Sequence, residues 1–264
     1  MAAYTAKDVA TLRQMTGAGM LDCKNALEET GGDMEEAVKL LRMKGLAGAA
    51  KRSDREATEG AAAAARSGDA AAVVELRCET DFVAKADDFV ALADELAALV
   101  AAKGEDATGE LDAEIDGLRT TLKENISVGR VRRLVAEPGQ VMETYVHRQA
   151  GRGVNAVAVV LEGGSDELAH DIAVHIAFTK PAYLSRDEVP EAEVAAERET
   201  LTTISRNEGK PEAAMEKIVE GRMTGWFKER VLLDQAYVRD EKQTIAGMLG
   251  SARIVSFAQV VIGA

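Results

Sequence analysis

A pattern of two strands followed by a helix occurs twice in this chain. Residues 58–66 and 70–78 flank the turn "SGD", and residues 141–147 and 154–161 flank "RQAGRG". Such apolar runs around Gly-containing turns are typical of β-hairpins. Each pair is followed by apolar residues at helical spacing: Phe89, Leu92, Leu96 and Leu99 in the first case, Ile172, Ile176 and Ala177 in the second. The repetition predicts an α+β fold with two related core subdomains and antiparallel strands.

The first 55 residues predict three short helices. Thr5 can cap the first helix, because Asp8 stands three residues later at the capping-box position. The glycines of "TGAGM" break the chain before a second helix, from about Met20 to Glu29. Asp33 can cap a third helix. We therefore expect a separate three-helix domain at residues 1–55.

The rest of the chain divides at the changes of pattern. A helix near residues 111–123 and the strand "SVGRVRRLVA" complete a first core subdomain at 56–138. Residues 139–264 form the second, which ends in a short helix and the strand "RIVSFAQVVI". Two helical stretches around "NEGKP" predict a projecting helical hairpin inserted at about 187–231.

Composition excludes several classes of protein. The net charge is −13, so nucleic acid is not expected as a direct partner, since neutralising phosphates requires clustered Lys and Arg. No apolar run is long enough to span a bilayer. The two cysteines, Cys23 and Cys78, form no CxxC pair. We predict a cytoplasmic protein without membrane contact.

The sequence contains no constellation typical of an enzyme. The phosphate-binding pattern GxxxxGK[ST] and the metalloprotease pattern HExxH are both absent. His170 and His175 could suggest a metal hydrolase, but five helical residues place them about 140° apart. We expect no catalytic residues, no cofactor and no metal.

The stretch "LRQMTGAGMLDCKNAL", residues 12–27, places Met20 and Leu21 just after a Gly-rich elbow. Apolar side chains at helical spacing are usually core residues, so packing inside the three-helix domain is the simpler interpretation. The alternative is a surface that binds a partner.

The stretch "ELRCETDFVAK", residues 75–85, joins a strand to a new helical turn. Thr80 can cap this turn, and Asp81 is favoured in it by the helix dipole. Phe82 then lies in the first turn, where it either fills the local core or projects toward another protein.

Together these two motifs resemble the signature stretches of the elongation factor Ts family. Further likeness is carried by "ENISVGRVRRL", "HIAFTKPAYL" and "IVEGRM". The resemblance implies a ubiquitin-associated-like N-terminal domain, a core of two α+β subdomains and a projecting helical hairpin. It also implies a guanine-nucleotide exchange factor that binds elongation factor Tu with GDP, expels the GDP and stays bound until GTP enters.

The resemblance also implies roles for particular residues. Thr80, Asp81, Phe82 and Val83 match the stretch that enters the nucleotide-binding domain of Tu, where the aromatic ring disturbs the Mg²⁺ and phosphate site. Asp81 could serve as a helix cap or as a partner contact. The remaining partner-binding residues implied are Arg13, Met20, Leu21 and His147.

Two other expectations concern partners. An adaptor that binds through its three-helix domain would account for residues 1–55, but it leaves "ETDFVAK" without a purpose. The hairpin could contact Tu or form a homodimer within the complex, and the sequence leaves that choice open.

Overall fold

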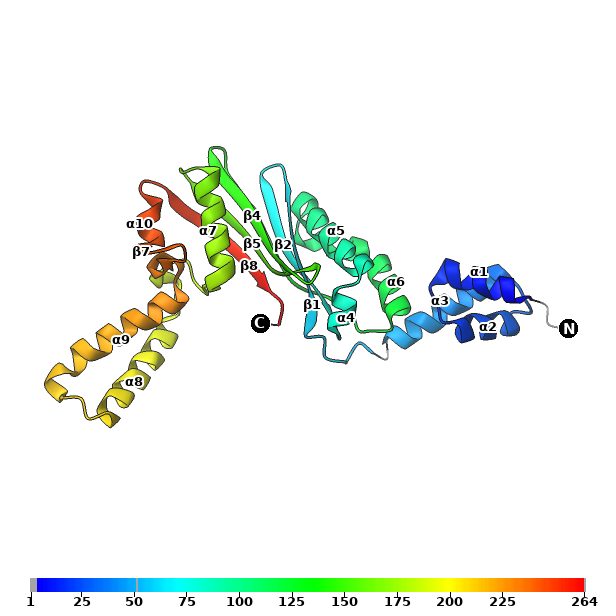
Figure 1. The fold of residues 1–264 in the computed structure, drawn as a ribbon, viewed down its shortest axis with the longest axis horizontal. Helices are drawn as coiled ribbons and strands as arrows, with labels where there is room; N and C mark the ends of the chain where they lie inside the picture. Colours follow the sequence, from blue (N-terminus) through cyan, green and yellow to red (C-terminus); the bar gives the residue numbers. More distant parts are fainter. Residues whose placement is uncertain (1–3, 51, 264) are drawn as a thin grey trace.

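The computed structural model describes residues 4–50 and 52–263, and residues 1–3, 51 and 264 lie outside the description. The fold is α+β, as predicted, and the molecule is elongated, with a helical bundle at one end and a helical hairpin at the other (Figure 1). We propose that domains divide at residues 55/56 and 138/139, because these positions lie between the successive groups of elements.

The bundle consists of α1 (Ala6–Thr16), α2 (Met20–Glu29) and α3 (Met34–Ala50). Thr5 and Asp8 form the predicted capping box. Leu12, Cys23 and Leu27 are fully buried in a core that belongs to the bundle alone. Three helices at the N-terminus are therefore confirmed.

The bundle rests on α6 (Asp112–Leu122) through small residues. The position where Gly17 would carry a Cβ lies 2.8 Å from Thr121 Cγ2, and the corresponding position at Gly45 lies even closer to Thr120. A side chain at either glycine would push the two surfaces apart. Lys123 also forms an ion pair with Asp22 at 3.0 Å. α3 itself continues past Gly45, to Ala50.

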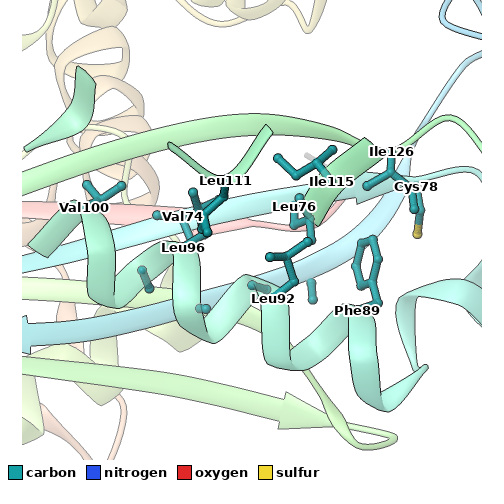
Figure 2. Packing of buried hydrophobic residues seen from close by; sticks show 14 of the residues in the cluster. Val74, Leu76, Cys78, Phe89, Leu92, Leu96, Val100, Leu111, Ile115 and Ile126 are labelled. Carbon is teal, nitrogen blue, oxygen red and sulfur yellow. The ribbon is translucent and has the colours of Figure 1, made fainter. Parts of the chain in front are cut away.

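The first sheet has the order β1-β2-β3 and is antiparallel throughout. Its strands are β1 (Glu59–Ser67), β2 (Ala70–Cys78) and β3 (Ser127–Val135). One face packs against α5 (Asp87–Lys103) and α6 (Asp112–Leu122), with the short 3₁₀ helix η1 (Glu105–Leu111) between them. The resulting core includes Leu76, Phe89, Leu96 and Ile126, and Phe89 and Cys78 lie at the same end of it (Figure 2).

The second sheet repeats this arrangement with the order β4-β5-β8. Its strands are β4 (Gln140–Gln149), β5 (Arg152–Glu162) and β8 (Arg253–Val261), and α7 (Asp166–Thr179) covers its outer face. β4 and β5 are longer than predicted, because a two-residue turn with positive φ at Ala150 and Gly151 joins them.

The two sheets pack face to face, so the core has four layers in the order α7, second sheet, first sheet, α5 (Figure 1). Small side chains dominate this contact, which also contains Met142. The buried members are Ala62, Ala71, Val73, Ala136, Met142, Ala156, Ala158, Val160, Ala258 and Val260.

Arginines tie the two sheets together at their edges. Arg152 of β5 donates to the Gly60 carbonyl oxygen at 2.6 Å and to Glu59 at 2.7 Å. Arg130 of β3 donates to the carbonyl oxygen of Val261 and to the buried carboxylate of Glu75. Burial raises the pKa of Glu75, but the hydrogen bonds from Arg130 and Arg77 outweigh it and hold that pKa below its ordinary value.

The hairpin consists of α8 (Glu191–Asn207) and α9 (Met215–Arg230). It has a core of its own, which includes Met215, Met223, Trp226 and Phe227. A bridge between Tyr183 and Val231 closes its base. Short 3₁₀ turns flank the helices at η2 (Arg186–Glu188), η3 (Glu212–Ala214) and η4 (Leu232–Asp234).

The chain then forms a small hairpin that the sequence did not predict, β6 (Ala236–Tyr237) and β7 (Asp240–Thr244), followed by α10 (Ile245–Leu249). Among residues 4–50 and 52–263, no helix has the length and apolar character needed to cross a membrane.

Candidate functional site

The segment after β2 forms a single helical turn, α4 (Asp81–Ala84), before α5 begins. Thr80 is its N-cap: its backbone is extended (φ −122°, ψ 152°), and its hydroxyl accepts from the Val83 N–H at 3.4 Å. The predicted cap is therefore correct.

The turn points its apolar residues in opposite directions. Phe82 is 82% exposed, the largest exposure among the large apolar side chains of the described residues. Val83 and Ala84 are buried against the core that contains Phe89. Val83 is the apolar anchor on the inner face of the turn, and the partner contact expected of it stays a prediction. The core interpretation of Phe82 is wrong: its ring lies outside that core.

Asp81 does not cap the turn, since Thr80 does. Its carboxylate accepts a hydrogen bond from Lys85 Nζ at 2.5 Å, one turn later along the chain. This hydrogen bond and the charge of Lys85 hold the pKa of Asp81 below its ordinary value. The pair is part-exposed, so Asp81 is accessible from solvent beside Phe82.

Two residues from the turn before β3 hold the start of the segment, and sequence reasoning missed both. The Glu124 carboxylate accepts from the Glu79 N–H at 3.0 Å, the Thr80 N–H at 3.1 Å and the Thr80 hydroxyl at 2.5 Å. The Asn125 N–H donates to the Glu79 carboxylate at 2.7 Å. Both residues begin the stretch "ENISVGRVRRL", which carried family likeness, but that likeness did not indicate where their side chains would point.

The thiol of Cys78, which directly precedes this segment, is unreactive. Burial, with a further contribution from the Glu124 charge, raises the pKa of Cys78 to about 12. Cys78 is fully buried and remains a neutral thiol near pH 7. It therefore has a packing role.

Met20 and Leu21 lie on the surface of the bundle rather than in its core. They are 52% and 67% exposed, because α2 begins at Met20 and turns Cys23, Ala26 and Leu27 inward instead. The core interpretation of these two residues is therefore wrong. Arg13 is also exposed, in the last turn of α1.

His147 lies far along the chain, on β4 beside a β-bulge between His147 and Arg148. It is exposed and lines a groove of about 630 Å³, together with Arg152, Phe178 and Lys180. The expected site residues thus fall into three groups, on the bundle, on α4 and on the second sheet, instead of one pocket.

The remaining two histidines do not act together. His175 is fully buried and contacts the Gln235 Oε1 atom at 2.9 Å, and burial lowers the pKa of its ring. His170 is exposed and contacts Glu143 at 3.6 Å. Within residues 4–50 and 52–263, no three His, Cys, Asp or Glu side chains are grouped so that they could hold a metal ion. The metal-hydrolase alternative thus has no structural support.

Comparison with known proteins tests the family directly. The family model described as elongation factor TS matches residues 79–264, a stretch that starts at the segment leading into α4. The chain belongs to the elongation factor Ts family. Because the match lies outside the three-helix bundle, an adaptor that uses only the bundle would leave it unexplained.

Curated relatives support the same assignment over the full length. The elongation factors Ts of Clavibacter michiganensis subsp. michiganensis and of Clavibacter sepedonicus are each 46% identical to this chain. That of Kineococcus radiotolerans is 44% identical. In all three cases the alignment covers 100% of both chains. Membership of the elongation factor Ts family implies nucleotide exchange in translation elongation.

Proposed function

We propose that this protein binds elongation factor Tu carrying GDP, promotes release of the GDP by disturbing the Mg²⁺ and phosphate site, and remains bound until GTP enters. The observation that carries the proposal is the exposed ring of Phe82 on a turn whose backbone is held at Thr80 and Val83. A large apolar side chain held in that position gains free energy when a partner buries it.

The turn is suited to enter a cleft because it is already ordered. The Thr80 cap, the buried Val83 and the Asp81–Lys85 pair fix its backbone before any partner arrives. Docking Phe82 then costs little conformational entropy. Burial of the ring contributes about 2 kcal/mol to the complex.

The other exposed groups supply binding at a distance from the nucleotide. We assign Met20, Leu21 and Arg13 to a contact between the bundle and Tu, and His147 to a contact with another part of Tu. An exposed apolar pair at the start of a helix fits a hydrophobic groove or helix face on a partner. These contacts increase the affinity without acting on the nucleotide.

Exchange follows from linkage between the two ligands of Tu. A factor that weakens nucleotide binding is itself weakened by nucleotide by the same ratio. The protein can thus expel GDP and be expelled by GTP. No cofactor or metal of its own is required, and we place the protein in the cytoplasm, without membrane or direct nucleic-acid contact.

The test is stopped-flow release of a fluorescent GDP analogue from the cognate Tu. At saturating factor, Phe82→Ala should slow stimulated release roughly tenfold to thirtyfold, because about 2 kcal/mol of coupling is lost. Val135→Ala is the matched control: Val135 is 52% exposed and pairs with Ala70, at the end of β3 remote from Arg77 and the Phe82 turn.

Release at the wild-type rate with Phe82→Ala would show that the ring does not act on the nucleotide. Met20→Ala combined with Leu21→Ala should behave differently. It should raise the concentration of factor needed for half-maximal release and leave the saturating rate nearly unchanged.

A further inference from the structure

The turn between α6 and β3 touches the segment that presents Phe82. One oxygen of the Glu124 carboxylate accepts the N–H groups of Glu79 (3.0 Å) and Thr80 (3.1 Å). The other oxygen accepts the Thr80 hydroxyl at 2.5 Å. A single side chain, 44 residues away from Thr80, thus binds three donors in two adjacent residues.

These donors lie just beyond the ladder of the first sheet. The last residues of β2 that pair with a neighbouring strand are Cys78, opposite Glu59, and Arg77, opposite Ser127. The N–H groups of Glu79 and Thr80 therefore need an acceptor from elsewhere. Glu124 provides one, and hydrogen bonds to an ionised carboxylate are stronger than neutral ones.

The direction of Phe82 depends on what holds Thr80. α4 has only four residues, far fewer than a helix needs to be stable alone. Its inner side is anchored by Val83 and Ala84, and its N-terminus by Thr80, whose hydroxyl contacts both Glu124 and the Val83 N–H. Removing the anchor at Thr80 would free the turn to rotate about its inner contacts.

We propose that Glu124 is a positioning residue for nucleotide exchange, which holds the Phe82 ring in the orientation that enters the partner. This inference rests on the proposed function of Phe82. Glu124 acts through the backbone of residues 79 and 80 and through the Thr80 hydroxyl, and does not itself touch the nucleotide.

The neighbouring Asn125 extends the same turn toward the bundle. Its side-chain amide donates to the carbonyl oxygens of Ser53 at 3.1 Å and Arg55 at 2.7 Å, on the linker from α3. The residue that follows Glu124 therefore fixes where the linker passes. The turn thus holds the Phe82 segment and the linker to the bundle at adjacent positions.

The first test needs no partner and uses the full chain. Hydrogen–deuterium exchange of residues 79–84 should become at least about tenfold faster in Glu124→Ala, since loss of the acceptor lowers the protection of these amides. Glu124→Gln should restore most of the protection, because its amide oxygen can still accept both N–H groups. The matched control is Glu105→Ala, because the Glu105 carboxylate also accepts a backbone N–H, that of Arg133 at 2.8 Å, remote from Phe82.

The second test is stimulated GDP release at saturating factor, measured as a double-mutant cycle. Glu124→Ala should slow release roughly tenfold in the wild-type background and have no further effect in the Phe82→Ala background, because both changes remove the same action. Glu124→Gln should recover release, and Glu105→Ala should match wild type. If Glu124→Ala does not fold, Glu124→Asp, one methylene shorter, takes its place in both tests.

The outcomes separate this inference from the proposed function. Two results would overturn the positioning role of Glu124: unchanged hydrogen–deuterium exchange at residues 79–84, or equal slowing of GDP release by Glu124→Ala with and without the Phe82 ring. Either result would leave the proposed role of Phe82 intact. If Phe82→Ala alone leaves release unchanged, the proposed function fails, and the positioning role fails with it.

Discussion

The two halves of the core connect the second strand of the hairpin to the following helix in different ways. In the second half, β5 reaches α7 through Gly163 and Gly164, both with positive φ, and Ser165 caps the helix at 3.2 Å from the Leu168 N–H. In the first half, β2 reaches α5 through an additional turn, α4. Both connections use a hydroxyl cap, but only the first exposes an aromatic ring.

The difference shows what a projecting ring requires. The short glycine connection has Ser165 as its cap, and its two glycines lie against Ala252. The longer one is held by Glu124, by the Asp81–Lys85 pair and by the burial of Val83. An exposed Phe at a fixed angle therefore depends on polar contacts that a simple strand-to-helix connection lacks.

The largest expected effect is the difference in the free energy of unfolding between substitutions of Phe82 and Phe89, which lie on either side of the end of the first connection. Phe89 is fully buried and Phe82 is 82% exposed. Phe89→Ala should lower the free energy of unfolding by about 3–5 kcal/mol, and Phe82→Ala by no more than about 0.5 kcal/mol. Equilibrium unfolding in urea measures both. A similar loss for the two variants would mean that the Phe82 ring packs on its own core in solution.

A smaller effect compares the two caps. Ser165→Ala should cost about 1 kcal/mol, since it removes one cap hydrogen bond, and Thr80→Ala about 2 kcal/mol, since it also removes the bond to Glu124. Only Thr80→Ala should also slow stimulated GDP release, because the Thr80 hydroxyl contacts Glu124 as well. Unfolding curves and stopped-flow release measure the two quantities. Slowing by Ser165→Ala to the same degree would contradict a special role for the first connection.

The smallest effect concerns pH. The pKa of Asp81 is lowered by its contact with Lys85. The pair therefore stabilises the folded state fully at pH values above the unfolded pKa of an aspartate, and this stabilisation is lost as the pH falls through the lower, folded pKa. Lys85→Ala should move the NMR titration midpoint of the Asp81 carboxyl carbon upward, toward the ordinary value. Lys103→Ala, at a lysine paired with Glu110, is the control and should leave that midpoint in place. An unmoved midpoint in Lys85→Ala would show that the pair does not form in solution.

Much of the fold followed from local patterns. The Thr5 capping box, the start of α2 at Met20 and both strand–strand–helix units were predicted, because caps, glycines and apolar periodicity act over a few residues. The face-to-face packing of the two sheets was not predicted. Alanine-rich strands such as β1 carry little contrast between their two sides, so the pattern did not show that both were covered.

The residues of the candidate site were likewise predictable only where local sequence determines them. Thr80 was predicted as a cap from its own neighbours, and the structure agrees. Helical spacing favoured a buried Met20 and Leu21, and family resemblance was needed to expect them on the surface, where they lie. Glu124 and Asn125 could not be predicted from local pattern, because their contacts join segments that lie 44 to 72 residues apart.

The alanine-lined contact between the sheets limits how the chain can be divided. Each sheet is covered on its outer side by its own helices and on its inner side by the other sheet. Either half made alone would expose that inner face to water and to other edges and faces like it, and would be prone to aggregate. The two units repeat a pattern along the sequence, yet they share one buried interface, so truncation experiments should cut at the bundle or the hairpin and spare the core.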